Sequence, residues 1–315
     1  MEKTVKPFGH IGVLMGGYSS EREISLKSGH AVFTALREAG CRVTGLDITV
    51  QEEEKIFHFI KESKIDAAFI ALHGRLGEDG TIQAILEKAG IVYPGSGVEA
   101  SRLAINKSKT QQMLKGKNIP VPEHISLRDG SQVDIDSIVR ALGLPVVVKP
   151  SCEGSSIGIS LVQQKEQLAV ALAAAFRYGN EVLVEEYLWG KELTVGILDK
   201  EPLTVVEICP KNNFFDFTSK YQPGMTRYRI PAKISLRETK KVQSLAMAAH
   251  QALGCADFSR VDLILDGTGN PFVLEVNTIP GFTSMSLLPK AARAHGINFT
   301  DLCLKLIHLA YEKKE

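Results

Sequence analysis

One segment constrains the fold of this chain most: residues 259–281, which read SRVDLILDGTGNPFVLEVNTIPG. The stretch DGTGN consists of residues that strongly favour a turn, and it lies between two β-prone runs, so the segment predicts a β-hairpin. A four-residue loop at the turn would place Asp262 opposite Glu275 and Arg260 opposite Asn277. Because side chains alternate along a strand, these four share one face of the hairpin. The other face is predicted to be apolar, with Val261, Leu263 and Leu265 against Phe272, Leu274 and Val276.

Two carboxylates at facing strand positions predict a bound cation. Directly opposed like charges destabilise a sheet unless a cation lies between them. Magnesium takes oxygen ligands and is commonly held by one or two carboxylates together with substrate phosphates. We therefore expect Asp262, Glu275 and the Asn277 carbonyl to bind a divalent metal, with Arg260 as a fixed positive charge beside it. The alternative is a solvated sheet face without a metal.

A glycine-rich loop at residues 149–158, KPSCEGSSIG, lies between two apolar strand-like runs. It departs from the Walker pattern, in which Gly-Lys-Ser/Thr follows a strand and opens a helix. Lys149 in this loop and Lys107 near the start of a helix are candidates to hold phosphate oxygens. Taken singly, each is also an ordinary solvated lysine. The segment VEEYLWGKEL follows, and four of its residues are candidates to contact a ribose and an adenine: Glu185, Glu186, Leu188 and Glu192. The alternative is that they are solvated residues at a strand end.

The first hundred residues alternate strand and helix. Apolar runs in HIGVLMGG, CRVTGLDI, DAAFIALHG and GIVYPGSG predict strands, with helices at about 52–63 and 81–89. The first helix is expected to have a capping box of Ser20 and Glu23 and to stop at Gly40. Such alternation implies a parallel sheet whose ligands lie beyond the carboxyl ends of the strands. A Rossmann dehydrogenase is not favoured, because GVLMGGYSSE has no GxGxxG.

A chain of 315 residues is long enough for two or three domains. The predicted domains are 1–101 (α/β), 102–188 (a small α+β domain) and 189–315. The second is expected to begin with one helix at 102–117. The stretch 211–231 has no convincing period and is long for a connection, so we expect it to form a lid.

Composition limits the partners and the compartment. The net charge is +1, from 37 basic and 36 acidic residues, which gives no bulk reason to expect nucleic acid or an anionic membrane as a partner. No segment approaches the roughly 18 apolar residues of a membrane span. The five cysteines are scattered and form no CxxC pair, which is typical of free thiols in a reducing compartment. We therefore expect a cytoplasmic protein.

Six motifs occur in order along the chain: GGYSSEREISLKSG, ALHGRLGEDGTIQ, KPSCEGSSIG, KY…TRY…PA, RVDLILD and LEVNTIPGFTSMSLLP. Together they resemble the ATP-grasp superfamily and, within it, the D-alanine–D-alanine ligase family. The resemblance implies an N-terminal parallel-sheet (pre-ATP-grasp, Rossmann-like) domain followed by a two-part ATP-grasp fold. It also implies a homodimer that ligates two D-alanines with ATP through an acyl phosphate, for peptidoglycan precursor synthesis. Two Mg²⁺ or Mn²⁺ ions would be needed, with K⁺ as a candidate activator.

The resemblance further implies a role for each matched position. The metal ligands would be Asp262, Glu275 and Asn277. The nucleotide would contact Lys107, Lys149, Ser155, Glu185, Glu186, Leu188, Glu192 and Lys220. The D-alanines would contact Glu21, which receives the first ammonium group, and His73, Lys220 and Ser286. The tetrahedral oxyanion would be stabilised by Arg260 and the Gly281 N–H, and a hydrogen-bonded trio would comprise Ser155, Tyr221 and Ser286.

Several positions depart from the family pattern or bear on specificity. Phe215 and Phe217 lie where family members often carry tyrosines. Cys152 replaces a residue that is often arginine or another polar side chain, and we expect it to be a spectator. Tyr221 favours D-alanine over D-lactate as the second substrate.

Alternatives stay open from the residues alone. Without the family match, His73 is favoured as a structural histidine at a strand end, and Glu21 could serve only the dipole of the first helix. Two other function classes are a ligase with another acceptor, such as D-lactate or D-serine, and a catalytically silent nucleotide-binding protein. The complete GGYSSEREIS and PGFTSMSLLP segments argue against the first class. The presence of every metal, lysine and arginine position argues against the second.

Overall fold

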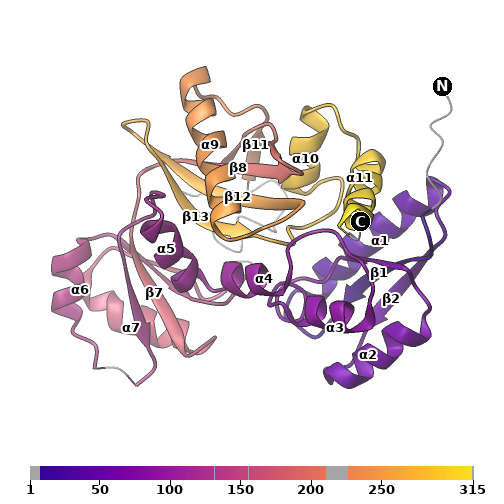
Figure 1. The fold of residues 1–315 in the computed structure, drawn as a ribbon. Helices are drawn as coiled ribbons and strands as arrows, with labels where there is room; N and C mark the ends of the chain where they lie inside the picture. Colours follow the sequence, from indigo (N-terminus) through magenta and orange to yellow (C-terminus); the bar gives the residue numbers. More distant parts are fainter. Residues whose placement is uncertain (1–7, 131, 155, 211–225, 314–315) are drawn as a thin grey trace.

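The structure is a computed structural model that describes residues 8–130, 132–154, 156–210 and 226–313. Three sheets follow one another along the chain, and Figure 1 shows them with helices packed on their faces. The first sheet is parallel and the other two are antiparallel. The predicted fold class, a parallel-sheet domain followed by α+β layers, is therefore confirmed.

The first sheet has the strand order β2-β1-β3: β1 (Ile11–Gly16), β2 (Val43–Ile48) and β3 (Ala67–Ile70). The helices of this part are α1 (Arg22–Glu38), α2 (Glu53–Glu62) and α3 (Thr81–Ala89). Gly40 ends α1 as predicted, since its φ of +83° is the left-handed conformation that stops a helix. The run GIVYPGSG forms an isolated parallel bridge from Val92 to Ala67 instead of the predicted fourth strand. Pro94, two residues on, has no N–H to continue such a ladder.

The turn between β1 and α1 differs from the prediction. The prediction of a capping box formed by Ser20 and Glu23 is wrong, because α1 begins at Arg22, with Glu21 at its N-cap position and no side-chain cap. Instead, the Arg22 guanidinium donates to both carboxylate oxygens of Asp47, each at 2.8 Å. This bidentate pair ties the turn to the end of β2 and so fixes the backbone that presents Glu21.

Two helices replace the single one predicted at 102–117: α4 (Val98–Ile105) and α5 (Lys107–Gly116). Asn106 interrupts the run with an extended backbone, φ −87° and ψ 96°. Its side-chain oxygen accepts the Lys109 N–H at 2.9 Å, and asparagine is among the strongest N-cap residues. The break places Lys107 at the first position of α5.

The second sheet is antiparallel in the order β4-β7-β5-β6: β4 (His124–Arg128), β5 (Val146–Pro150), β6 (Ser160–Val162) and β7 (Glu181–Glu186). A buried apolar cluster joins this sheet to α6 (Ile135–Leu142) and α7 (Lys165–Phe176). The glycine-rich loop connects β5 to β6, as predicted. β7 leads through residues 187–189 into the third sheet.

The third sheet has the order β11-β10-β8-β12-β13, with β9 paired to β8. Its strands are β8 (Gly190–Leu198), β9 (Glu201–Pro202), β10 (Val206–Pro210), β11 (Thr226–Arg229), β12 (Phe258–Asp266) and β13 (Pro271–Asn277). A capping box of Ser235 and Glu238 opens α9 (Leu236–Ala252). The buried residues of α9 pack on the apolar face of this sheet, which is opposite the face that carries the acidic residues.

The β12–β13 hairpin forms with a register shift that was not predicted. Its open end has the expected pairs, Arg260–Asn277 and Asp262–Glu275. A bulge then pairs Leu263 with Val273 instead of Leu274. Because a one-residue slip exchanges the two faces of a strand, Val273 is buried in the core and Leu274 faces the opposite side. The prediction that Phe272 and Leu274 lie on the apolar face is therefore wrong.

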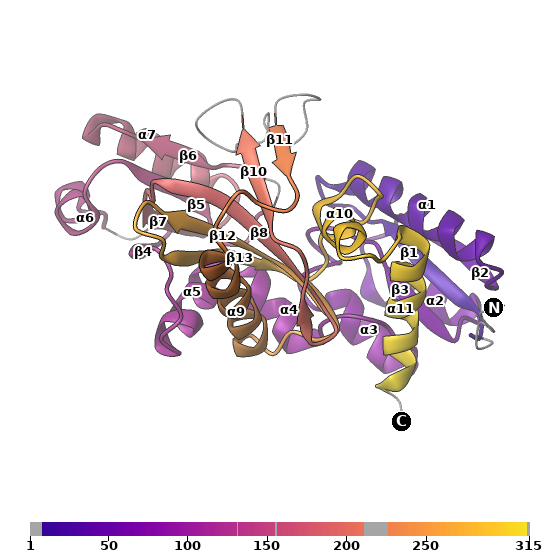
Figure 2. The same cartoon turned by 90° about the horizontal axis from the view of Figure 1, so that it is seen from above.

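The last two helices described are α10 (Leu287–Ala294), which packs against β8 of the third sheet, and α11 (Phe299–Glu312), which packs on the first sheet. Figure 2 shows α11 beside α1 and β3. Leu302 and Leu306 of α11 share one buried cluster with Ile11, Val13 and Leu36. The C-terminal segment therefore covers the N-terminal sheet, a packing that was not predicted. The domain boundaries at 101/102 and 188/189 stay predictions.

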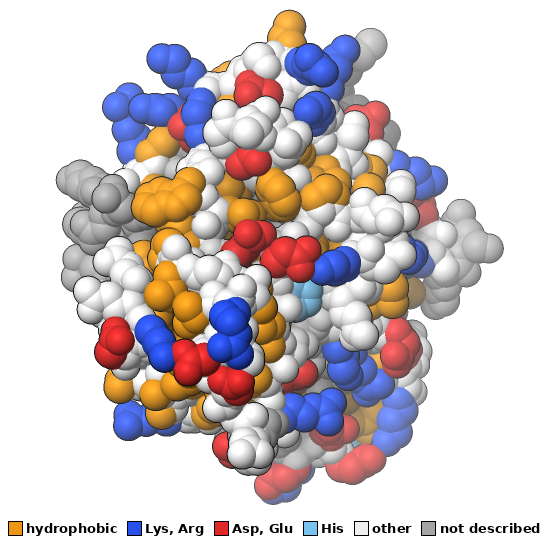
Figure 3. Space-filling model, turned by 90° about the vertical axis from the view of Figure 1, so that its left-hand side faces the viewer, with side chains coloured by type: hydrophobic (Ala, Val, Ile, Leu, Met, Phe, Trp, Pro, Cys, Tyr) orange, Lys and Arg blue, Asp and Glu red, His pale blue; other side chains and the backbone are white. Residues whose placement is uncertain are grey.

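The surface carries charges of both signs. On the face in Figure 3, Lys and Arg side chains are interspersed with Asp and Glu, and hydrophobic side chains lie between them. Within the described ranges, no helix is both long enough and apolar enough to cross a membrane.

Candidate active site

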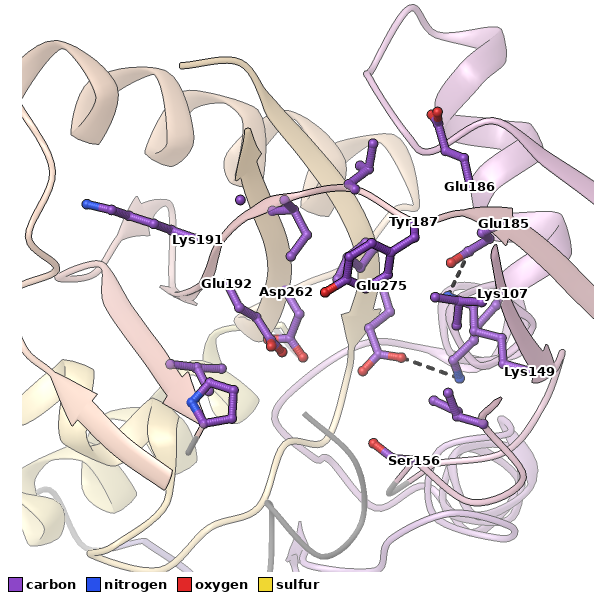
Figure 4. Close-up of a pocket in the computed structure, with 18 of the residues that line it drawn as sticks. Lys107, Lys149, Ser156, Glu185, Glu186, Tyr187, Lys191, Glu192, Asp262 and Glu275 are labelled. Atoms are coloured by element: carbon purple, nitrogen blue, oxygen red, sulfur yellow. Dashed lines mark ion pairs between the residues drawn. The ribbon is translucent and has the colours of Figure 1, made fainter. Parts of the chain in front are cut away.

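A cavity of about 330 Å³ lies between the second and third sheets. This volume is within the usual range for a small-molecule site. Strands β5 and β7 line one side, and β8, β10, β12 and β13 line the other (Figure 4). The cavity brings together most of the residues predicted to bind nucleotide and metal: Lys107, Lys149, Glu185, Glu186, Leu188, Glu192, Asp262 and Glu275.

The two predicted metal-binding carboxylates converge on one amide. Asn277 Nδ2 lies 3.2 Å from Asp262 Oδ2 and 3.4 Å from Glu275 Oε1. Arg260 makes a bidentate pair with Asp262, with Nε 2.9 Å from Oδ1 and Nη2 2.7 Å from Oδ2. Thr194 Oγ1 donates to Asp262 Oδ1 at 2.6 Å. The hairpin therefore holds Asp262 in one orientation and leaves the acids on a common face, as predicted.

Arg260 provides a permanent positive charge in this cluster. Burial, the largest single influence, lowers the pKa of its guanidinium, but the charge and hydrogen bonds of Asp262 together with the charges of Glu275 and Glu78 outweigh it. The net pKa is raised above an already high value, so the side chain stays charged throughout the ordinary pH range. This charge offsets part of the repulsion between the two acids.

The oxygen atoms of this cluster fit a hard divalent cation. Mg²⁺ binds through one or two carboxylates plus water and phosphate oxygens, and two carboxylates and one amide lie on adjacent strands here. In the described part of the chain, no three His, Cys, Asp or Glu side chains are arranged to hold a metal by themselves. A cation at this hairpin would therefore take further oxygen ligands from water or from a bound phosphate. Asn277 would also have to turn its amide, because the nitrogen faces the acids.

Both predicted phosphate-binding lysines are buried and paired. Figure 4 shows the two ion pairs: Lys149 Nζ lies 2.7 Å from Glu185 Oε1, and Lys107 Nζ lies 3.4 Å from Glu275 Oε2. Lys107 Nζ also donates to the Glu153 carbonyl of the glycine-rich loop at 2.6 Å. Only 8% of Lys107 and 6% of Lys149 is exposed, which argues against the alternative of ordinary solvated lysines.

The cavity is also lined by residues that were not predicted as site residues, among them Tyr187, Glu207 and Leu274. Glu207 is 5% exposed and accepts hydrogen bonds from Arg229 Nη1 and the Lys233 N–H, both at 3.0 Å. A glutamate inside the apolar run VVEIC is the signal that could have found it. Leu274 reaches the cavity because of the bulge. Burial raises the pKa of the Tyr187 hydroxyl, which keeps it neutral in the cavity wall.

A second cavity, of about 340 Å³, adjoins the first, because Glu153 and Gly154 line both. Glu21 and Arg75 are part of its wall. The Glu21 carboxylate lies tightly between two glycine backbones. A Cβ atom added to Gly74 would lie 2.8 Å from Glu21 Oε2, and one added to Gly154 would lie 3.0 Å from it. Glu21 therefore presents its charge at the junction of the two cavities.

The remaining described candidates lie in or near the turn that follows β13. His73 is 4% exposed, with Nε2 3.0 Å from Ser28 Oγ and Nδ1 3.2 Å from the Ile279 carbonyl. These contacts support the structural-histidine alternative, and the substrate contact of His73 stays a prediction. A Cβ atom on Gly281 would lie 3.3 Å from Ser286 Oγ, so these two candidates are neighbours.

Other predictions fall outside the described residues: Ser155, Phe215, Phe217, Lys220 and Tyr221. Most of the stretch 211–231, predicted to be a lid, also lies outside them. Cys152 is described, and its exposed side chain lines the second cavity.

The fold and the site define an ATP-grasp enzyme, in which two α+β layers enclose a nucleotide-sized cavity with paired acids and buried lysines. Two family models match the chain, D-ala D-ala ligase N-terminus over residues 47–96 and D-ala D-ala ligase C-terminus over residues 113–308. The chain belongs to the D-alanine–D-alanine ligase family.

Similar proteins extend over almost the whole chain. The D-alanine–D-alanine ligase of Geotalea uraniireducens is 45% identical over 300 residues, covering 95% of each chain. That of Desulforudis audaxviator is 46% identical over 307 residues, covering 96% of this chain and 99% of the relative. The solved D-alanine–D-alanine ligase of Bacillus anthracis complexed with ATP has a TM-score of 0.85 at 33% identity, covering 97% of this chain and 98% of its own. The VanG D-Ala:D-Ser ligase of Enterococcus faecalis has a TM-score of 0.83, also at 33% identity, covering 96% of this chain and 99% of its own.

Proposed function

We propose that this enzyme uses ATP to join two D-alanine molecules into D-alanyl-D-alanine. One observation carries the proposal: the two cavities share a wall at Glu153 and Gly154. A D-alanine whose ammonium group meets Glu21 would therefore lie beside a nucleotide whose phosphates meet the two buried lysines. The names of the relatives and the ATP in the Bacillus anthracis structure support these substrates.

The first step activates a carboxylate. An oxygen of the first D-alanine carboxylate attacks the γ-phosphorus of ATP, the bond from that phosphorus to the β–γ bridging oxygen breaks, and ADP leaves. The product is an acyl phosphate, which is needed because a carboxylate oxygen is a poor leaving group. Glu21 orients the amino acid, while Lys107 and Lys149 neutralise the phosphates. The catalysis is therefore positioning and charge neutralisation.

The second step forms the peptide bond. The neutral amine of the second D-alanine attacks the acyl carbon, and a tetrahedral oxyanion forms. The bond from carbon to the phosphate oxygen then breaks, phosphate departs, and the nitrogen releases one proton to it. Arg260 and the Gly281 N–H would donate to the oxyanion, as the family resemblance implies. Arg260 suits this role because its charge is permanent.

The metal ions belong to the proposal as well. Asp262, Glu275 and Asn277 would hold Mg²⁺ or Mn²⁺, with two ions expected from the family resemblance. When bound, such a cation screens the negative charge that builds up on the transferring phosphoryl group. K⁺ activation, a homodimer, a cytoplasmic location and a role in peptidoglycan precursor synthesis rest on the same resemblance.

D-serine as the second substrate is a further candidate. The chain is as similar in identity to VanG D-Ala:D-Ser ligase as to the Bacillus anthracis enzyme, and the TM-scores are 0.83 and 0.85. The fold alone does not separate these acceptors. The relatives at 45% and 46% identity are named D-alanine–D-alanine ligases, which favours D-alanine.

A product assay tests the proposal. Purified protein is given ATP, Mg²⁺ and D-alanine, D-serine, D-lactate or L-alanine, alone and in pairs, and ADP, phosphate and dipeptide are measured. We expect ADP and D-alanyl-D-alanine in equal amounts with D-alanine, and neither with L-alanine. Absence of D-alanine-dependent ADP formation over a range of pH and K⁺ concentration would contradict the proposal. Preferential D-alanyl-D-serine formation would establish the further candidate.

A further inference from the structure

A buried chain of hydrogen bonds joins the first sheet to the turn that follows β13. Ser28 Oγ lies 3.0 Å from His73 Nε2, and His73 Nδ1 lies 3.2 Å from the Ile279 carbonyl. The Phe282 N–H donates to Ser28 Oγ at 3.2 Å. Ser28 is fully buried, and 4% of His73 and 1% of Phe282 is exposed. We call Ser28 and His73 the relay pair.

The direction of each bond in this chain follows from its chemistry. A carbonyl oxygen only accepts, so the bond to Ile279 requires the proton of neutral His73 on Nδ1. Nε2 then has a free lone pair and accepts the hydroxyl proton of Ser28. The Ser28 oxygen keeps lone pairs for the Phe282 N–H. Glu78 Oε1, 3.7 Å from Nδ1, favours the same tautomer. Every polar group is satisfied in one arrangement, so the pair specifies a single position of the turn.

The relay pair connects the two parts of the molecule that carry the two sets of candidate site residues. Ser28 lies on α1, the helix that begins directly after Glu21. Ile279 and Phe282 lie in the turn that continues β13, the strand that carries Glu275. The helix behind the predicted ammonium-binding residue is therefore bonded to the backbone that follows the predicted metal ligands.

We propose that Ser28 and His73 are positioning residues that set α1 and its Glu21 against β13 and the turn at residues 278–282. The proposal rests on the function proposed above. Its consequence is greatest for the second chemical step, because Gly281 lies inside the turn that the relay pair holds. A displaced Gly281 N–H would weaken the stabilisation of the oxyanion, while the nucleotide cavity, which none of residues 278–282 lines, would keep its shape.

Apolar packing also holds this turn, but it is less directional. The Phe282 ring packs against Phe69, with ring centroids 5.2 Å apart, and against Phe258 at 6.1 Å. Such ring contacts tolerate sliding, whereas a bond to the Phe282 N–H fixes the backbone. Removing the Ser28 hydroxyl should therefore leave the turn folded but shifted.

The same helix offers a matched control. Ser25, three residues or nearly one helical turn before Ser28, is also fully buried and also makes two hydrogen bonds. It accepts from the Gly16 N–H at 2.8 Å and donates to the Ala71 carbonyl at 2.8 Å. Both partners belong to the first sheet or its edge. Ser25→Ala therefore removes an equally buried hydroxyl without touching the turn after β13.

The test compares Ser28→Ala, Ser25→Ala and the unaltered enzyme by steady-state kinetics and by the ratio of dipeptide to ADP. For Ser28→Ala we expect kcat for dipeptide to fall by about tenfold with KM for ATP within about twofold, because the positioning that is lost serves the second step most. The acyl phosphate should then hydrolyse more often, so that less than about half of the ADP is matched by dipeptide. Ser25→Ala should lower the melting temperature similarly but keep the ratio near one.

Each outcome decides the question. Equal ratios in both variants would overturn the relay pair as a positioning device. If Ser28→Ala does not fold, Ser28→Cys is used, since it fills the same space with a weaker donor, and its ratio should lie below that of Ser25→Ala; a ratio equal to that of Ser25→Ala would overturn the proposal too. If the unaltered enzyme makes no dipeptide, the proposed function fails instead, and the two failures are thereby distinguished.

Discussion

Lys107 Nζ lies 3.4 Å from Glu275 Oε2, so a predicted phosphate-binding lysine is paired with a predicted metal ligand. Lys149 and Glu185 form the corresponding pair at 2.7 Å on the other wall of the cavity. These pairs compensate charges that would be costly to bury alone. A nucleotide with its cation offers both kinds of group new partners, phosphate oxygens for the lysines and the metal for Glu275. Binding would therefore exchange the Lys107–Glu275 ion pair for contacts of both side chains with the nucleotide and its cation.

Replacing Glu275 should abolish turnover without unfolding the protein. Glu275→Ala removes a carboxylate from the predicted metal site, and Glu275→Gln removes its charge while keeping its shape. We expect kcat to fall by roughly 10²–10³-fold in both, because the metal stabilises charge in the transition state. The measurements are ADP release and thermal unfolding, with Glu201→Ala, an exposed glutamate of β9, as the control. An unchanged kcat would remove the metal assignment.

Replacing the cysteine of the glycine-rich loop should have little effect. The Cys152 side chain is exposed in the second cavity. We expect Cys152→Ser to keep kcat and both KM values within about twofold, as is usual for substitutions of a side chain that makes no essential contact. Steady-state kinetics with D-alanine and ATP varied separately measure this. A loss of tenfold or more would show that the thiol has a role after all.

Removing the Tyr221 hydroxyl should change the choice of the second substrate. Tyr221 lies outside the described residues, and its predicted trio with Ser155 and Ser286 rests on the family resemblance. We expect Tyr221→Phe to raise the use of D-lactate relative to D-alanine by about tenfold in kcat/KM. The reason is that a hydrogen-bonding group in a polar site discriminates between substrates more strongly than an apolar contact does. Phe217→Tyr, in the same stretch, should leave the ratio as it was. An unaltered D-alanine/D-lactate ratio in Tyr221→Phe would refute this specificity role.

The parts of the site that could be predicted depend on local pattern. The pairing of Asp262 with Glu275 follows from a turn and a two-residue alternation within one short segment. The bulge beside it could not be predicted, because Phe272, Val273 and Leu274 are all apolar. A hydrophobic pattern fixes register only where apolar and polar residues alternate. The sequence therefore leaves open which of these three side chains faces the cavity.

The parts that could not be predicted depend on contacts between distant segments. The ring nitrogens of His73 bond to residues 45 and 206 positions away, and nothing near His73 in the sequence indicates either partner. The packing of α11 on the first sheet is of the same kind. An amphipathic pattern shows that a helix has a buried face, but it does not show which sheet covers that face.

Acidification should destabilise the protein through His250. This buried histidine lies on α9 with Nδ1 2.7 Å from Ser259 Oγ, and burial lowers its pKa from 6.5 to about 4. Between these values the unfolded chain binds a proton at His250 that the folded chain does not bind. The free energy of unfolding should therefore fall as the pH drops from 6.5 towards 4, by roughly 1.4 kcal/mol per pH unit from this group, with no contribution above 6.5.

Urea unfolding at several pH values measures this linkage. His250→Gln removes the titrating group, so the difference in unfolding free energy between the native sequence and the variant should shrink as the pH falls through this window. The difference at pH 7.5 gives the cost of the substitution itself, since the native side chain is neutral there in both states. A difference that stays constant from pH 7.5 to pH 4.5 would show that His250 does not carry the acid sensitivity.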